Sequence, residues 1–379
     1  MQSAAKKTQQ TGSSLRLAMV TFAVVKTLAH CRIALLAALV VYPLGAMAQS
    51  ATPAVPAPSE VKSYLLTALG KMETAANEFV ADAAAYDSLV KARGGNVAEA
   101  FKTSPAEITH LVEALREEYK AMDSFGYETI EGIVAGVPSL SEFDVYLDSG
   151  VPQDQAGGGT PVAPVVLALP TGDKIDHAGC LFTYLIEPML WGSNRKLVVP
   201  VDLDHDGSVG PRESLPRTDV LTAVANDVRA QIHQLHETAL AWKPTTSDCF
   251  AAIITMTPTL SGYFDDWKEA RFGHATSAKF TAVSRVSDMR GIMSSVAILY
   301  GAVEAEVAGK DPALATSIER GFSGVLAFID RVQRREEKAG AALAAAEIDE
   351  LGEQAKQKAD KLVPQVEQAA AILAVQPAG

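Results

Sequence analysis

Residues 59–93 read SEVKSYLLTALGKMETAANEFVADAAAYDSLVKAR, a stretch rich in Ala, Leu, Glu, Lys and Val that contains no proline. Leu65, Leu69 and Met72 recur at the spacing of one face of an α-helix. Ser59 can cap the start, and two glycines follow the last periodic residue. The stretch therefore predicts a long helix with one buried face, and it points to a helical protein.

The same 3.6-residue pattern continues along most of the chain, and no segment shows sustained strand alternation. Ser104 and Glu107 predict a helix start with a capping box. Gly309 predicts a helix end, and Asp311-Pro312 predicts the next start. The expected helices span 59–93, 105–122, 127–137, 175–190, 217–241, 247–257, 259–270, 277–308, 311–338 and 341–374.

The expected fold class is all-α, a two-part antiparallel helical bundle. The chain is long for a single bundle, so we expect two helical halves at 59–243 and 244–379, divided at Lys243-Pro244. Residues 138–174 interrupt the helical pattern with several prolines and three consecutive glycines. Long irregular stretches of this kind in compact domains are often functional.

The N-terminus has the composition of a secretory signal peptide. Its first 48 residues contain five basic residues and no acidic one, and the apolar run 33–42 precedes an A-x-A site that ends at Ala48. The run is too short to span a membrane as a helix, so cleavage after Ala48 is expected, with either Met1 or Met19 as the start. The mature protein, beginning with a Pro/Ala-rich linker at 49–58, is expected in the periplasm or outside the cell, without a membrane span.

The charge balance excludes one class of partner. The chain has 33 basic and 45 acidic residues, and loss of the five basic residues of the leader leaves a net charge of −17. Such an acidic protein is a poor binder of nucleic acid. Cys180 and Cys249 either form a disulfide or are buried thiols. His233 and His236 stand three residues apart, as a weak metal pair or on a solvated helix face.

Residues 202–213 read DLDHDGSVGPRE, which matches every position of a twelve-residue EF-hand calcium loop. Calcium needs six to eight oxygen ligands around one point, and Gly207 stands where the loop must turn sharply. Ser208 would contribute its carbonyl and Gly210 a water, while Glu213 can close the shell with two oxygens. The expected calcium ligands are Asp202, Asp204, Asp206, Ser208, Gly210 and Glu213.

A structural role is expected for this loop, because the sequence holds no second D-x-D-x-D-G run to pair with it as in a calcium sensor. The loop lies between a helix that ends near Trp191 and one that starts near Arg217. Calcium is plentiful outside the cytoplasm, so even a weak site, with Kd of roughly 10⁻⁴ to 10⁻³ M, would fill there. The simpler alternative is an acidic surface turn.

Three segments resemble the imelysin-like family, helical exported proteins that include periplasmic iron-uptake components. They are YETIEGIVAG at 127–136, LFTYLIEPMLWG at 181–192, and DMRGIM at 288–293 with LYG at 299–301, followed by DPAL at 311–314 and by Phe322. The resemblance covers most of the mature chain at low identity. It implies an all-helical exported protein, with a membrane iron transporter component as its partner.

In that family a G-x-H-x-x-E motif supplies two metal-ligating side chains from one helix face. Here Phe182 stands at the glycine position and Tyr184 at the histidine position, while Glu187 keeps the acid. Some members are described as metallopeptidases, but this chain has no H-E-x-x-H, and no catalytic residue is assigned. Tyr184 is either a phenol ligand for a hard ion such as ferric iron or a core residue.

A second metal site follows as a hypothesis from the same resemblance. Glu131 and Glu187 lie on two helices that carry it, and facing helices commonly build metal sites from such acids. Asp144 would add a third oxygen and Tyr184 a fourth, and an oxygen-only set favours ferric iron or another hard cation over zinc. The alternative is that both glutamates form salt bridges or face water.

The function expected is that of an exported calcium-binding helical protein, with a mainly structural EF-hand loop, that takes calcium and a second metal such as iron, or a small ligand, in metal uptake. Two alternatives stay open. One is an imelysin-like metal-dependent peptidase or hydrolase, and the other is a scaffolding partner of an iron importer with no site of its own.

Overall fold

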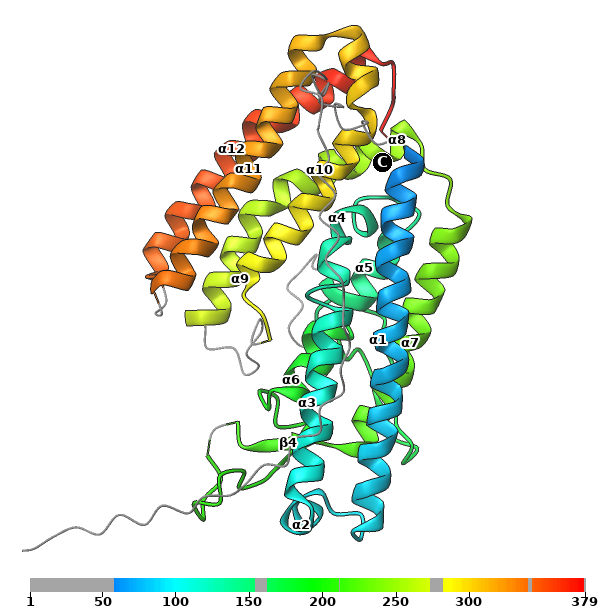
Figure 1. The fold of residues 1–379 in the computed structure, drawn as a ribbon, viewed down its shortest axis with the longest axis vertical. Helices are drawn as coiled ribbons and strands as arrows, with labels where there is room; N and C mark the ends of the chain where they lie inside the picture. The colour runs from blue at the N-terminus through cyan, green and yellow to red at the C-terminus, as the bar shows by residue number, and fades with distance from the viewer. Residues whose placement is uncertain (1–57, 154–161, 211, 273–281, 340–342, 378–379) are drawn as a thin grey trace, which may run out of the picture. The chain divides into compact units, whose positions relative to one another are not determined.

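The computed structural model describes residues 58–153, 162–210, 212–272, 282–339 and 343–377, and within them the chain is mostly helical (Figure 1). The all-α expectation is confirmed, since the described strands are two short antiparallel pairs. The predicted signal peptide and nearly all of the linker lie outside the described residues. Residues 53–379 form one unit.

The first helices follow the apolar periodicity of the sequence closely. Helix α1 spans Pro58–Ala92 and packs against α3, Pro105–Met122, and α7, Thr218–Ala241. The face of α1 that includes Leu65, Leu69 and Met72 is fully buried, as its spacing predicts. The short α2, Val97–Thr103, connects α1 to α3.

The second half of the chain contributes a further set of packed helices. These are α8, Thr246–Met256, the 3₁₀ turn η4, Thr257–Thr259, α9, Leu260–Phe272, α10, Arg285–Lys310, α11, Pro312–Ala339, and α12, Ala345–Ile372. Helix α12 packs on α9, and α11 packs on α10. Helix α10 also contacts α1 and the short helices of the first half, so it joins the two sets.

Among the described helices, α10 alone has the length and apolar composition needed to cross a membrane. Half of its apolar window is buried inside the protein, and its first turn buries Arg285 and Asp288. Both features are those of a core helix.

Short elements fill the region between α3 and α7. The first are the 3₁₀ turn η1 (Tyr127–Thr129) and the helices α4 (Glu131–Val134) and α5 (Ser141–Asp144). They are followed by the π-helices η2 (Val145–Ser149) and η3 (Phe182–Ile186) and by the helix α6 (Glu187–Leu190). Strands β1, Leu167–Ala168, and β2, Lys174–Ile175, pair antiparallel, as do β3, Val198–Pro200, and β4, Ser214–Pro216. In the second pair, Val198 lies opposite Pro216 and Pro200 opposite Ser214.

Some local predictions were wrong. The helix expected at 277–308 begins only at Arg285, because Ser284 caps it by accepting a hydrogen bond from the backbone nitrogen of Val286. The helix expected at 175–190 begins only at Phe182, because His177 and Gly179 adopt positive φ angles of 47° and 87° that a right-handed helix cannot include. The capping box at Ser104 does not form. The Ser104 hydroxyl instead accepts a hydrogen bond from Arg93 Nε at 3.0 Å, which ties the end of α1 to the start of α3.

Glycines allow α10 to approach the short helices closely. A Cβ on Gly132 of α4 would lie 2.5 Å from Ser295 Oγ and 2.9 Å from the carbonyl oxygen of Ile292. A Cβ on Gly291 would lie 2.9 Å from the carbonyl oxygen of Glu128. The helices therefore pack at a distance that larger residues would prevent.

We predict that Gly132→Ala lowers the free energy of unfolding by about 1–3 kcal/mol, because the added methyl group overpacks the contact between α4 and α10. Gly324→Ala is the matched control, since a Cβ there meets nothing within 4 Å. In the interior of α11 that change should stabilise the protein by about 0.5–1 kcal/mol. Urea unfolding of both variants is the measurement, and a Gly132→Ala protein as stable as wild type would contradict the prediction.

Candidate metal centre

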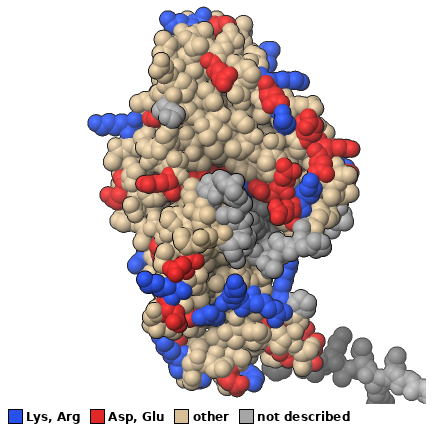
Figure 2. Space-filling view, turned by 180° about the vertical axis from the view of Figure 1, so that it is seen from behind, with Lys and Arg blue, Asp and Glu red and all other residues tan. Residues whose placement is uncertain are grey.

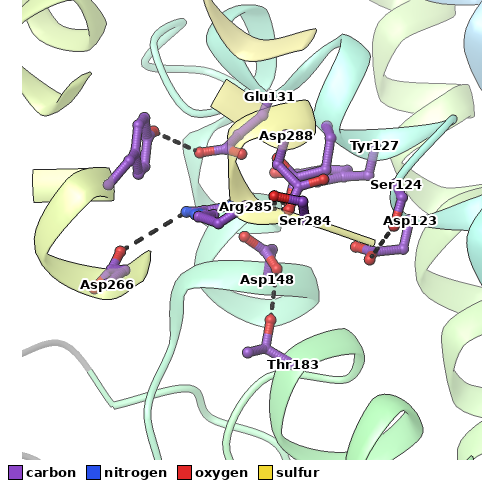
Figure 3. A network of polar contacts seen from close by, with 12 residues as sticks. Asp123, Ser124, Tyr127, Glu131, Asp148, Thr183, Asp266, Ser284, Arg285 and Asp288 are labelled. Atoms are coloured by element: carbon purple, nitrogen blue, oxygen red, sulfur yellow. Dashed lines mark hydrogen bonds and ion pairs between the residues drawn. The ribbon is translucent and has the colours of Figure 1, made fainter. Parts of the chain in front are cut away.

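A group of acidic side chains is buried where α10 meets the short helices of the first half (Figure 3). Asp123 follows α3, Glu128 lies in η1, and Asp288 lies in the first turn of α10. These three residues are at most 7% exposed. Glu131 and Glu187 are buried beside them, and Asp148 is half-buried.

A cavity of about 10 Å³ lies within this group. That volume is about what one water-sized sphere occupies. Oxygens of Asp123, Glu128 and Asp148 lie within 4.8 Å of one another, as ligands of one metal ion would. The polar residues that line the cavity are Tyr119, Asp123, Ser124, Glu128, Asp148, Thr183, Glu187 and Asp288.

The two π-helices carry part of this lining. Asp148 lies in η2 and Thr183 lies in η3, and the Thr183 hydroxyl donates to Asp148 Oδ1 at 2.7 Å. A π-helix has wider turns than an α-helix and occurs frequently at functional sites. Here the two π-helices meet through this bond, which orients Asp148 at the edge of the cavity.

One buried guanidinium, that of Arg285, lies among the described carboxylates (Figure 3). Its Nη1 donates to Glu128 Oε1 at 3.2 Å and lies 3.9 Å from Asp288 Oδ2. Its Cζ stands 4.5 Å from the centre of the Tyr263 ring, and the Tyr263 hydroxyl donates to Glu131 at 2.8 Å. A single positive charge cannot balance several ionised carboxylates in a medium of low dielectric constant.

Some carboxylate oxygens of this group also lack hydrogen-bond donors among the described residues. Asp123 Oδ1, Glu128 Oε2 and Asp288 Oδ1 are buried and accept no hydrogen bond from any described residue. Burial, with added repulsion from neighbouring carboxylates, raises the pKa of all three groups well above its ordinary value. A raised pKa favours the protonated form, so a metal ion that binds these carboxylates would have to compete with protons, and its affinity would fall as the pH falls.

A larger cavity of about 400 Å³ adjoins the small one, since Asp148 and Thr183 line both. Glu131 and Asp144 line it too, and burial with Coulombic repulsion raises the pKa of Glu131 to about 8 and that of Asp144 to about 6. Tyr184 is a further part of its wall. The larger cavity therefore lies beside the small one and has acidic side chains in its own lining.

The hypothesised second-site residues are thus divided between the two cavities. Glu131, Asp144 and Tyr184 line the larger one, and Glu187 lines the smaller one. Glu187 Oε1 also accepts a hydrogen bond from the backbone nitrogen of Ala282 at 2.9 Å. Asp144 accepts one from the Tyr127 hydroxyl at 2.8 Å.

Sequence reasoning missed several residues of the centre. A usable signal existed for most of them, because charged residues stand at helical spacing within apolar segments. The pairs are Glu128 with Glu131, Asp144 with Asp148, and Arg285 with Asp288. Asp123 had no such signal, since it enters the centre only through the turn that follows α3.

The 202–213 loop connects β3 to β4, so strands flank it directly where an EF-hand has helices. It lies between α6 and α7 as expected. Oxygens of Asp202, Asp204 and Asp206 lie within 4.8 Å of one another, and the buried Asp202 Oδ1 has no hydrogen-bond partner among the described residues. Gly207 turns the chain with a φ of 91°.

Glu213 joins the end of this loop to its beginning through hydrogen bonds. Its Oε1 accepts hydrogen bonds from the backbone nitrogens of Leu203 and Asp204 at 3.1 and 3.2 Å. The Asp206 carboxylate accepts bonds from the nitrogen and the hydroxyl of Ser208, both at 2.8 Å. The acidic side chains of the loop therefore converge within a backbone that these hydrogen bonds hold in place.

The remaining candidate pairs have structural roles. Cys180 and Cys249 are buried free thiols, and burial raises the pKa of both. His233 and His236 of α7 do not simply face water, because each places Nδ1 against the Glu73 carboxylate of α1, at 2.9 and 2.7 Å. These contacts join two long helices.

Comparison with known families gives one match. Residues 183–368 match the family model described as Peptidase_M75: Imelysin. The match begins within η3 and ends within α12, so it includes Glu187, Arg285 and Asp288 of the centre. A search of curated proteins gave no match. The family match supports an imelysin-like relationship over this part of the chain.

We predict that Arg285→Met lowers the free energy of unfolding by about 3–5 kcal/mol at neutral pH, because it removes the buried positive charge that Glu128 and Asp288 face. Arg290→Met is a matched control on the same helix. Arg290 pairs with Asp330 at 2.7 Å near the surface, and the loss of such a pair costs about 1 kcal/mol or less. Equal effects of the two substitutions in urea unfolding would show that Arg285 has no special role.

Proposed function

We propose that this protein is an exported, imelysin-like metal-binding protein that takes a hard cation into its buried acidic centre and calcium into its 202–213 loop. The match of residues 183–368 to the imelysin family supports the relationship. By the same resemblance, the protein would work in metal uptake beside a membrane transporter component.

The observation that carries the proposal is the ion-sized cavity lined by five acidic side chains. It is about 10 Å³ in volume, and three of the surrounding carboxylate oxygens have no hydrogen-bond partner among the described residues. Unsatisfied buried polar atoms are rare and costly in proteins. A bound cation would satisfy these oxygens and balance their charge together.

The chemistry of the lining selects the kind of ion. All its side-chain donors are oxygens, from carboxylates and from the hydroxyls of Tyr119, Ser124 and Thr183. Oxygen donors suit hard cations such as ferric iron, manganese, magnesium or calcium. Among the described residues, the side chains that line the two cavities include no histidine, so this part of the lining favours a hard cation over the zinc of a peptidase.

Metal counting can test the acidic centre. Metal-free protein would be incubated with excess iron(III) nitrilotriacetate or manganese together with calcium, desalted and analysed for bound metals. The wild type should retain calcium and a second ion. The double variant Asp123→Asn, Glu128→Gln should keep calcium and lose the other ion, because neutral amides of the same shape remove the charge while preserving the packing.

The calcium loop supplies the reciprocal control. Glu213→Gln should retain the second ion and lose calcium. If wild-type protein holds no metal except calcium at saturation, or if the double variant retains both ions, the acidic centre is not a metal site. Circular dichroism would show that each variant is folded.

We predict that calcium stabilises the protein without changing its fold. Binding to the folded state alone raises the free energy of unfolding by about 2.7 kcal/mol at a hundredfold excess over Kd. The melting temperature should rise with calcium in the wild type and stay unchanged in Glu213→Gln, which lacks a charged ligand. A large calcium-dependent change in helix content at low temperature would identify a sensor instead.

A further inference from the structure

A third cavity, of about 1020 Å³, has the opposite charge character to the centre. Arg195, Lys196 and Arg217 line one part of it, together with the amide of Asn194. Ile175, Ala178, Leu185 and Leu197 supply apolar walls. Its volume is at the upper end of the range for sites that bind small organic molecules.

Two of these cations have no acidic partner. Arg195 and Lys196 are exposed and form no ion pair with any described residue. Arg217, in contrast, binds Asp219 through Nε at 3.1 Å and Nη2 at 2.6 Å. Within the described lining, Arg195 and Lys196 therefore present two positive charges without an ion pair, and Asp176 is the one acidic residue.

The turn that carries the two cations is held in place. Arg217 Nη1 donates to the carbonyl oxygen of Lys196 at 3.1 Å. The backbone nitrogen of Arg217 donates to the carbonyl oxygen of Leu197, also at 3.1 Å. The side-chain oxygen of Asn194 accepts a hydrogen bond from the backbone nitrogen of Lys196 at 3.0 Å. These bonds fix the backbone before any ligand arrives, which lowers the entropic cost of binding.

The protein as a whole is acidic, so a local basic surface stands out. The net charge is −12, and Figure 2 shows several basic side chains close together across the lower part of the face drawn there, with acidic side chains beside them and over the rest of that face. A cavity lined by one sign of charge attracts counter-ions and raises their local concentration. Arg195 and Lys196 would attract anions in this way.

Tyr184 is shared by this cavity and the larger acidic one. It lines both the cavity of about 1020 Å³ and the cavity of about 400 Å³. The backbone at Gly179 packs closely against Tyr184. A Cβ at this position would lie 2.9 Å from Tyr184 Cβ and 3.0 Å from the Pro152 ring, so a larger residue would not fit. The basic cavity therefore shares a wall residue with the cavity that adjoins the acidic centre.

We propose that the basic cavity binds a small organic polycarboxylate, the anionic chelator with which a hard cation arrives. The proposal rests on the metal-binding function proposed above. Hard cations such as ferric iron stay in solution near neutral pH as complexes with oxygen-donor anions. The carboxylates of such a complex fit Arg195 and Lys196, and its organic body fits the apolar walls. The acidic centre then competes with the chelator for the ion.

Citrate binding to metal-free protein, measured by calorimetry, tests the site itself. Citrate should bind the wild type, and Arg195→Gln, Lys196→Gln should weaken the affinity at least tenfold. The control Arg320→Gln, Lys361→Gln removes the same charge from exposed positions of α11 and α12 and should leave the affinity unchanged. Absence of citrate binding, or equal affinity in all three proteins, would overturn the proposal. Tighter binding of inorganic pyrophosphate would identify a phosphate site and also overturn it.

Two further measurements separate this proposal from the function on which it rests. Asp123→Asn, Glu128→Gln should still bind citrate, whatever its effect on metal content. Iron supplied as ferric citrate should enter the centre more slowly in Arg195→Gln, Lys196→Gln than in wild type, with the same final occupancy. Equal rates of iron uptake in these two proteins would remove the delivery role.

Discussion

Charge balance around Arg285 is the constraint on which the rest of this structure depends. Burying carboxylates costs several kcal/mol for each ion unless charge and hydrogen bonds compensate. The Arg285 guanidinium contacts Glu128 and Asp288, while one buried oxygen each of Asp123, Glu128 and Asp288 accepts no hydrogen bond from the described residues. Since Arg285 belongs to α10 and Glu128 to η1, the packing of the two helical sets and the ionisation of the centre are linked.

The helices could be predicted from the sequence because their signals are local. Apolar residues at helical spacing identified α1, α3 and α7 to within one residue at each end. The failures came where a residue finds a competing partner or conformation. Positive φ angles at His177 and Gly179 interrupt the expected helix, and the Ser104 hydroxyl bonds to Arg93 instead of capping its own helix. Neither event leaves a signal in helical periodicity.

The two candidate sites differ in the same respect. The proposed calcium loop is contiguous, so its spacing alone predicts which residues would bind the ion, and oxygens of Asp202, Asp204 and Asp206 do converge. The acidic centre assembles residues from segments as distant as Asp123 and Asp288. Family resemblance pointed to Glu131 and Glu187, and pairs at helical spacing could have added Asp148 and Asp288. The arrangement of these acids around one cavity depends on tertiary packing, which no local pattern encodes.

The two π-helices carry a consequence for how this site tolerates change in chain length. A π-helical turn holds one residue more than an α-helical turn, so a segment such as η3 absorbs an extra residue within continuous helical structure. Deletion of one residue between Thr183 and Glu187 would replace the wide turn with an α-helical one, and the two residues would then stand three apart instead of four. Both side chains line the small cavity, so the changed separation would alter the distance between their oxygens there. The geometry of this lining thus depends on the length of a short segment as well as on the identity of its residues.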